Sequence, residues 1–94
     1  MSGQIAGTII AISESGNLVS DIASERLRDV PREAATIACD EHETIGIYPA
    51  DHPEEPMTLM AIVGPAGALE LTIVGDSAAM MLGVRVGEKI VVKW

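Results

Sequence analysis

The sequence predicts a mostly β protein, a small closed or nearly closed β-barrel of about seven short strands with one or two single-turn helices. Three observations lead to this prediction. Apolar runs rich in Val, Ile and Leu recur along the chain, turn-forming Gly, Pro, Asn and Ser separate them, and no long helical pattern lies between them. The length of 94 residues fits one domain, so we expect a single barrel over residues 1–94.

The first two strands are predicted to form a hairpin. Residues 4–12 read QIAGTIIAI, an uninterrupted β-branched run that is typical of a buried strand. The dipeptide Ser15-Gly16 then indicates a turn, because glycine readily adopts the backbone angles that tight turns require. Residues 17–22 follow as the second strand.

A short helical turn and a second hairpin are predicted next. Residues 24–29 have the pattern of a capped helical turn, with Ser24 as the candidate N-cap. Residues 34–39 and 44–48 are apolar runs split by the acidic residues 40–43, so we expect a hairpin with an acidic turn.

The second half of the chain contains a proline-rich loop, three strands and a short helix. Residues 49–56 are rich in proline and acidic residues, which predicts a surface loop. A helix is expected at residues 77–82, capped by Asp76 or Ser77 and ended by Gly83. The remaining strands are predicted at residues 57–63, 68–74 and 89–94.

Charge and composition exclude several classes of function. The net charge of −8 argues against nucleic acid, whose phosphates need a basic surface, and against an anionic membrane. Apolar residues make up 48% of the chain and aromatic ones only 2%, Tyr48 and Trp94, so the core must be aliphatic. No signal peptide or membrane-spanning run is visible, and the single cysteine, Cys39, cannot form an intramolecular disulfide. These features favour a cytoplasmic protein.

Few residues indicate catalysis or metal binding. Cys39 is expected to be a small buried residue rather than a nucleophile, because the candidate bases, His42 and His52, both lie in acidic turns. Residues 40–43, Asp-Glu-His-Glu, could be interpreted as metal ligands, but four adjacent side chains cannot converge on one ion without a sharp backbone turn. We therefore expect no catalytic residue and no metal site.

Glu70 is the one acidic residue embedded in an apolar strand. A buried carboxylate without a partner is costly, so the first expectation is that it faces outward on an edge strand. If it faces inward it needs a partner, and Arg85 is the candidate. A salt bridge at a subunit interface is the third possibility, and a functional role is the fourth.

Two longer segments carry a family resemblance. Residues 7–22 read GTIIAISESGNLVSDI, and residues 64–92 read GPAGALELTIVGDSAAMMLGVRVGEKIVV. Together they resemble the C-terminal domain of the S-adenosylmethionine hydroxide adenosyltransferases, a family that includes the fluorinating and chlorinating enzymes using the same cofactor. The order and spacing agree over most of the chain, and best at residues 67–71, 77–79 and 82–83.

The resemblance implies a barrel that works within an assembly. In the family, the barrel packs against the N-terminal domain of a neighbouring subunit in a trimer, and the adenosine end of S-adenosylmethionine lies in the seam. The larger N-terminal domain, which carries the acidic residue and much of the pocket, has no counterpart in these 94 residues. We therefore expect a free-standing copy of the barrel that forms a homo-oligomer, with a trimer favoured.

The same resemblance nominates four residues for ligand contact. Asn17 matches the family asparagine that contacts adenine or its sugar, and Tyr48 lies near the aromatic residue that stacks on adenine. Gly75 and Ser77 belong to the stretch whose backbone hydrogen-bonds the adenine edge. The residues alone leave structural alternatives open, with Asn17 as a hairpin residue and Tyr48 as a core or interface residue.

Several positions depart from the family pattern. Ser13 replaces the aspartate near the amino-acid end of the cofactor, and Pro65-Ala66 replaces the polar pair that holds its carboxylate. Asp21 replaces an asparagine, and Ala68 replaces a tyrosine. These changes remove groups that would pair with the methionine tail, which argues against binding of intact S-adenosylmethionine.

The leading hypothesis is a non-catalytic, self-associating barrel that binds an adenine nucleoside weakly or pairs with a separate partner. Adenosine and S-adenosylmethionine are the ligands to consider. One alternative is a small oxyanion-binding barrel of the molybdate type, because residues 77–88 also fit the ending of such domains. The other is a stand-alone enzyme that acts on a molecule related to S-adenosylmethionine.

Overall fold

The computed structural model describes residues 3–49 and 54–94. Over these residues, eight strands, one 3₁₀ turn and one short α-helix follow each other along the chain. The strands are β1 (Gln4–Ile12), β2 (Leu18–Ala23), β3 (Thr36–Cys39), β4 (His42–Ile45), β5 (Ile47–Pro49), β6 (Leu59–Val63), β7 (Ala68–Ile73) and β8 (Lys89–Lys93). The 3₁₀ turn is η1 (Ser24–Leu27) and the helix is α1 (Ala78–Leu82).

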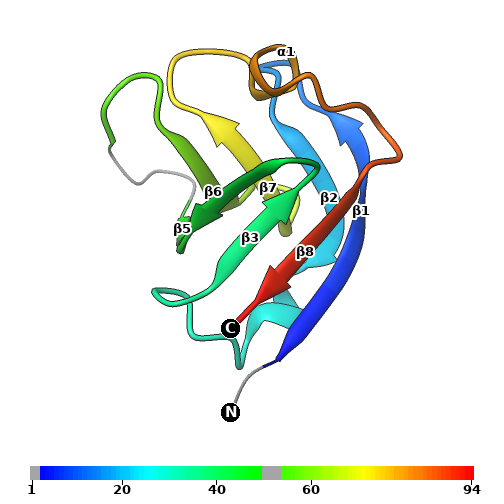
Figure 1. Cartoon of the computed structure of the whole chain (residues 1–94), viewed down its shortest axis with the longest axis vertical. Coiled ribbons are helices and arrows are strands. Elements are labelled where there is room, and N and C mark those ends of the chain that lie inside the picture. The colour runs from blue at the N-terminus through cyan, green and yellow to red at the C-terminus, as the bar shows by residue number, and fades with distance from the viewer. Residues whose placement is uncertain (1–2, 50–53) are drawn as a thin grey trace.

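The strands form one sheet that curls into a nearly closed barrel (Figure 1). Their order is β4-β3-β8-β1-β2-β7-β6-β5, and neighbours are antiparallel except β5 and β6, which are parallel. The curl brings β4 against β6, where the Thr44 hydroxyl donates a hydrogen bond of 3.1 Å to the Leu59 carbonyl. The predicted fold class, a small and nearly closed β-barrel, is therefore confirmed.

The barrel interior is aliphatic, as composition predicts. Alternate residues of each strand point inward, so Ile9, Leu18, Ile37, Leu71 and Val92 are all fully or almost fully buried. They belong to one continuous hydrophobic cluster without an aromatic residue at its centre. Burial of large aliphatic side chains contributes about 1.5–3 kcal/mol each, so this cluster is the main source of stability.

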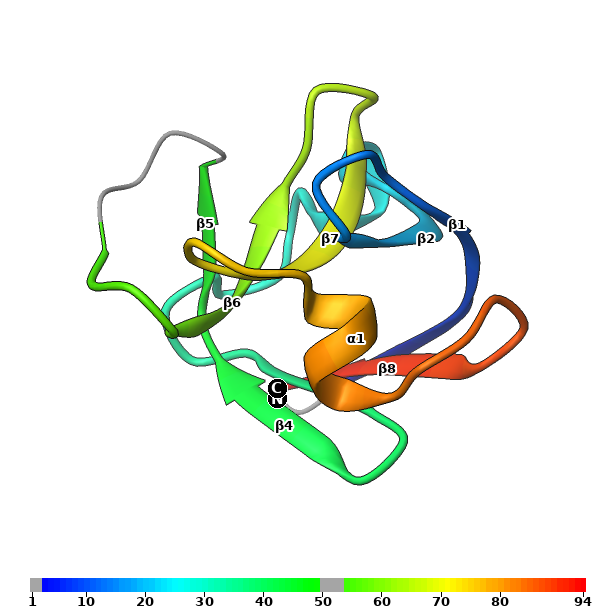
Figure 2. The same ribbon diagram turned by 90° about the horizontal axis from the view of Figure 1, so that it is seen from above.

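Helix α1 lies across one end of the barrel (Figure 2). It begins after Ser77, whose hydroxyl accepts a hydrogen bond of 3.3 Å from the Met80 amide, and it ends at Gly83, as predicted. Of the two predicted caps, Ser77 and not Asp76 therefore fills the role. The ring Nε2 of His42 donates to the Leu82 carbonyl at 3.0 Å, which joins the end of the helix to β4. No helix of the described residues is long and apolar enough to cross a bilayer.

Three local predictions need correction. The predicted strand at residues 44–48 is divided at Gly46, where a φ of 95° redirects the chain, and the part after it becomes β5. This division explains why eight strands replace the predicted seven. The acidic turn is shorter than predicted, because β4 already begins at His42. Ser24 lies inside η1, and Ala23 precedes the turn without a capping side-chain hydrogen bond.

Candidate functional site

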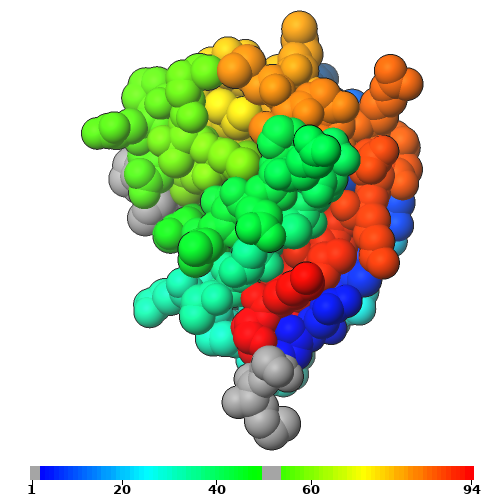
Figure 3. Space-filling view, in the orientation of Figure 1, coloured from blue at the N-terminus to red at the C-terminus, as the bar shows by residue number. Residues whose placement is uncertain are grey.

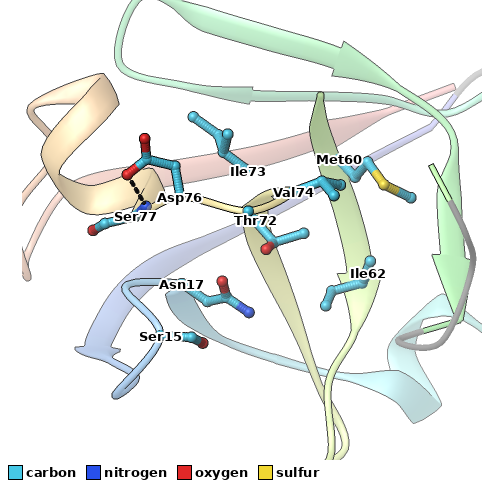
Figure 4. A pocket seen from close by; sticks show the side chains of 10 residues that line it. Ser15, Asn17, Met60, Ile62, Thr72, Ile73, Val74, Asp76 and Ser77 are labelled. Carbon is cyan, nitrogen blue, oxygen red and sulfur yellow. Dashed lines mark hydrogen bonds between the residues drawn. The ribbon is translucent and has the colours of Figure 1, made fainter. Parts of the chain in front are cut away.

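A pocket of about 570 Å³ opens on the outer face of the sheet, beside the turn that joins β1 to β2 (Figure 4). The side chains of Met60 and Ile62 on β6 are buried and form its apolar floor. The exposed residues Ser15, Gly75 and Asp76 form its rim. A buried floor and an exposed rim make a concave surface of the size that small-molecule ligands occupy.

Half-buried polar side chains line the walls between floor and rim. Asn17 directly precedes β2, Thr72 comes from β7 and Ser77 caps α1 (Figure 4). Each carries a hydrogen-bonding group, and the side chain of Val74 adds an apolar surface between them. The walls therefore combine apolar contact with a few polar groups, which is the usual composition of a binding site.

The β1–β2 turn holds Asn17 by its backbone. The Asn17 amide donates to the Ser13 hydroxyl at 3.0 Å, and the Ser13 amide donates to the Asn17 carbonyl at 3.0 Å. The carbonyl of Gly16 accepts from the Ala79 amide at 2.9 Å, so the turn is fastened to α1. These hydrogen bonds, within the turn and from the turn to α1, fix the position of Asn17 relative to Ser77.

Glu70 lies behind Asn17 on the same outer face. Its exposed fraction is 4%, and its Oε1 accepts a hydrogen bond of 3.2 Å from Nδ2 of Asn17. The side chain points to the outer face, as expected, but β7 is an interior strand and Glu70 is buried, so the expected edge position is wrong. The choice of Arg85 as its partner is also wrong, since Arg85 is exposed and Asn17 takes that place. The pairing joins residues far apart in the sequence, so no local pattern could identify it.

The segment after β7 contributes mainly its backbone. The Asp76 amide donates to the Ile73 carbonyl at 3.1 Å, and the Asp76 carboxylate accepts from the Ser77 amide at 2.7 Å (Figure 4). Gly75 carries no side chain, and an added Cβ there would meet nothing within 4 Å. A flat ligand can therefore approach the main chain closely at this position.

The pocket has few groups for acid–base chemistry. Among the described residues that line it, Asp76 is the one with an ionisable side chain, and it lies at the exposed rim. General acid–base or nucleophilic catalysis needs a nucleophile or base paired with an orienting group. The polar side chains of the walls, Asn17, Thr72 and Ser77, can form hydrogen bonds with a ligand.

Tyr48 does not line the pocket. It pairs with Ile62 across the parallel β5–β6 ladder, so its side chain leaves the sheet on the same face as that floor residue. The ring lies back over Gly46, where an added Cβ would come within 2.8 Å of the hydroxyl oxygen. The structure thus brings Asn17, Gly75 and Ser77 together and places Tyr48 beyond the floor.

The remaining chemically active side chains lie outside the pocket. Burial raises the pKa of the Cys39 thiol from 9.0 to about 11, and the nearby carboxylates of Glu88 and Asp40 add to this effect. A thiol with so high a pKa is a poor nucleophile. His42 is engaged by the Leu82 carbonyl, and His52 lies outside the described residues. Nowhere in residues 3–49 and 54–94 do three His, Cys, Asp or Glu side chains gather as metal ligands.

Residues 7–91 match the sequence profile described as the SAM hydroxide adenosyltransferase C-terminal domain. This chain belongs to that family. The match spans both segments that carry the resemblance, and it includes every residue that lines the pocket. Among curated proteins, no sequence matches the chain.

Two solved structures share the fold of this C-terminal domain. An uncharacterized conserved protein from Thermotoga maritima matches with a TM-score of 0.79 and 18% identity, over 93% of this chain and 35% of that one. A conserved hypothetical protein from Thermus thermophilus matches with a TM-score of 0.70 and 18% identity, over 93% of this chain and 34% of that one. The chain thus spans about a third of the length of these proteins.

Sequence reasoning missed the floor and one wall of the pocket. Met60 and Ile62 look like ordinary core residues in a strand, and Thr72 looks like a strand residue without a role. The alternation of strand residues offered a signal. Ala61 and Leu71 point into the barrel, so Met60, Ile62 and Thr72 beside them must point to the outer face. An outward apolar pair on β6 indicates a covered or ligand-binding face.

Proposed function

We propose that this C-terminal domain forms part of an adenine-nucleoside site in a self-associated barrel and carries out no catalysis by itself. One observation carries the proposal. Asn17, Gly75 and Ser77, which the family motif nominates from separate parts of the sequence, line a single pocket. The chemistry of the pocket supports the same ligand class.

Adenine has two apolar faces and a polar edge, and the pocket offers a surface for each. The buried side chains of Met60 and Ile62 suit a flat apolar face. Asn17, Thr72 and Ser77 supply an amide and two hydroxyls at the walls, where an adenine edge or a ribose hydroxyl can hydrogen-bond. A volume of about 570 Å³ is ample for a nucleoside.

The exposed rim supports completion of the site by a second protein surface. An open pocket buries only part of a ligand, so we expect weak binding by the isolated domain, with a Kd of about 0.1–1 mM for adenosine. In the assembled state a partner surface would cover the rim and would supply any reacting groups.

Self-association is supported by exposed apolar side chains near the helical end of the barrel. Met80 on α1 is 84% exposed, and the other exposed residues of this kind there are Ile10, Ile12, Met81 and Val86. In the space-filling view, α1 and the turn after it lie along the upper edge of the molecule, above β4 (Figure 3). Burial of such side chains between copies would remove them from water, and we propose a homo-oligomer, with a trimer as the first state to consider.

Light scattering tests the assembly. The purified protein should have the mass of an oligomer at micromolar concentration, and a M80K/M81K double variant should shift the mass toward the monomer while circular dichroism shows an intact β fold. A strictly monomeric mass for the unmodified protein would remove the assembly from the proposal.

Isothermal titration calorimetry with adenosine tests the ligand. The unmodified protein should bind, and Asn17→Ala should weaken binding about fivefold because it removes one ligand hydrogen bond. Glu43→Gln on β4, an exposed residue outside the pocket lining, is the matched control and should bind like the unmodified protein. No heat at millimolar adenosine, or equal binding by Asn17→Ala, would overturn the nucleoside proposal.

The oxyanion alternative has less support from the pocket. No basic side chain is among the described residues that line it, and the carboxylate of Asp76 lies at its rim. A negative group at the rim repels an oxyanion. Molybdate-dependent thermal stabilisation of the purified domain would nevertheless favour this alternative.

A further inference from the structure

Glu70 occupies an unusual position for an acidic residue. It lies in the middle of β7 with an exposed fraction of 4%, between two residues, Leu69 and Leu71, that point into the core. Its side chain therefore leaves the sheet on the outer face, the face that carries the pocket. Burial of a carboxylate without a hydrogen-bond partner lowers the stability of the fold, so we expect Glu70 to have a partner.

The Asn17–Glu70 hydrogen bond fixes which end of the Asn17 amide faces the pocket. A carboxylate only accepts hydrogen bonds, so Asn17 must turn its NH₂ group toward Oε1 of Glu70, at 3.2 Å. The amide oxygen then lies on the other side, and in Figure 4 it is on the side of Thr72. The Asn17 oxygen is thus the end of the amide that can accept a hydrogen bond from a ligand donor.

Gly64 makes room for the carboxylate of Glu70. An added Cβ at Gly64 would overlap Oε2 and the carboxyl carbon of Glu70 and would lie 3.0 Å from Oε1. The carboxylate therefore fills the space that a side chain at Gly64 would need, and its hydrogen bond to Asn17 fixes its orientation. The carboxylate of Glu70 is therefore packed closely beside Gly64 and bonded to Asn17.

We infer that Glu70 is a positioning residue that holds the Asn17 amide with its oxygen toward the pocket, so that the pocket selects a ligand group that donates a hydrogen bond. This inference rests on the proposed nucleoside site. The donor is either the exocyclic amine of adenine or a ribose hydroxyl, since both can donate to an amide oxygen. A ligand group that only accepts hydrogen bonds would leave the Asn17 oxygen without a donor, and such a ligand would bind less well.

The test compares nucleosides that each lack one donor. Adenosine is titrated against purine riboside, which lacks the amine, and against 2′-deoxyadenosine and 3′-deoxyadenosine, which each lack one hydroxyl. The unmodified protein should prefer adenosine to one of these analogues by about five- to tenfold, and that analogue identifies the donor. Glu70→Gln should reduce this preference to about twofold or less, because a glutamine amide can pair with either end of Asn17. Glu43→Gln should keep the full preference.

A second readout needs no ligand. In the NMR spectrum of the free protein, the side-chain NH₂ of Asn17 should show one protected, shifted proton, which Glu70→Gln should return toward the ordinary position. Gly64→Ala should do the same by displacing the carboxylate while residues 17 and 70 stay unchanged, and it replaces Glu70→Gln if that variant does not fold.

The outcomes separate the two proposals. If both variants keep the Asn17 signal and the adenosine preference of the unmodified protein, the positioning role of Glu70 is refuted. If the unmodified protein binds no adenosine, the nucleoside site is refuted, and the Asn17 signal alone then decides whether Glu70 orients the amide.

Discussion

Substitution of Gly16 by alanine tests the tight contact between Ser77 and the β1–β2 turn, whose residues Ser15 and Asn17 line the pocket. Gly16 has a φ of 87°, where a side chain costs about 1–2 kcal/mol. An added Cβ would also lie 2.5 Å from Cβ and 2.7 Å from Cα of Ser77, and overpacking of this kind costs about 1–3 kcal/mol. The Cα atom of Ser77 belongs to the backbone and cannot rotate away as a side chain can, so the backbone must move. We expect Gly16→Ala to lower the free energy of unfolding by about 2–5 kcal/mol.

Gly67→Ala is the matched control, because it measures only the cost of placing a side chain at a positive φ. Gly67 has a φ of 77°, and an added Cβ there would meet nothing within 4 Å. It should therefore lose only about 1–2 kcal/mol. Thermal unfolding followed by circular dichroism measures both variants, and 1 kcal/mol corresponds to about 4–8 °C for a domain of this size. Gly16→Ala should melt at least about 4 °C below Gly67→Ala. Equal melting temperatures would refute the contact between the β1–β2 turn and Ser77.

Three further predictions concern Cys39, the Asn17–Glu70 pair and His42. The Cys39 thiol should not react with a disulfide reagent at about pH 7.5 in the folded protein but should react fully in denaturant. Because the pKa of this thiol is raised from 9.0 to about 11 by folding, the unfolded chain loses the proton first, and the free energy of unfolding should fall as the pH rises from 9.0 to about 11. Well below pH 9 the ionisation of this thiol should not affect the free energy of unfolding. A double-mutant cycle with Asn17→Ala and Glu70→Ala, each of which removes one partner of the hydrogen bond, is followed by urea unfolding and should give a coupling of about 1–3 kcal/mol; additive effects would contradict the buried pair. Removal of the His42 ring should cost about 0.5–1.5 kcal/mol, because the Leu82 carbonyl loses its donor, and an unchanged midpoint in urea would contradict that bond.

The order of the elements could be predicted from the sequence because it depends on local signals. Apolar runs of β-branched residues marked most strands, and Ser77 and Gly83 marked the two ends of α1. These features arise within a few residues of chain, where alternation and turn chemistry act directly. The nearly closed barrel followed from many short strands without connecting helices.

The partner of β5 could not be predicted, because it depends on a contact between distant strands. Residues 44–48 are a single apolar run in the sequence, and nothing local indicates that Gly46 divides it. After the division, β5 pairs in parallel with β6. The same limit applies to Tyr48, because its distance from the pocket depends on where that short strand lies.

The environment of Glu70 was the larger error in the site. Sequence reasoning favoured an outward position on an edge strand and named Arg85 as the partner of an inward-facing Glu70. The structure satisfies it with a neutral amide, Asn17, beside a missing side chain at Gly64. Neither relation is visible in the sequence, because the three residues come together only when β2, β6 and β7 lie side by side.

Chemical-shift mapping with adenosine tests the central claim most directly. A ¹⁵N-labelled sample is titrated into the millimolar range, and backbone and side-chain amide signals are followed residue by residue. We predict progressive shifts at Asn17, Thr72, Gly75 and Ser77, with the β3–β4 hairpin unchanged. Shifts that gather on another face, or no shifts at millimolar adenosine, would contradict a nucleoside site in this pocket.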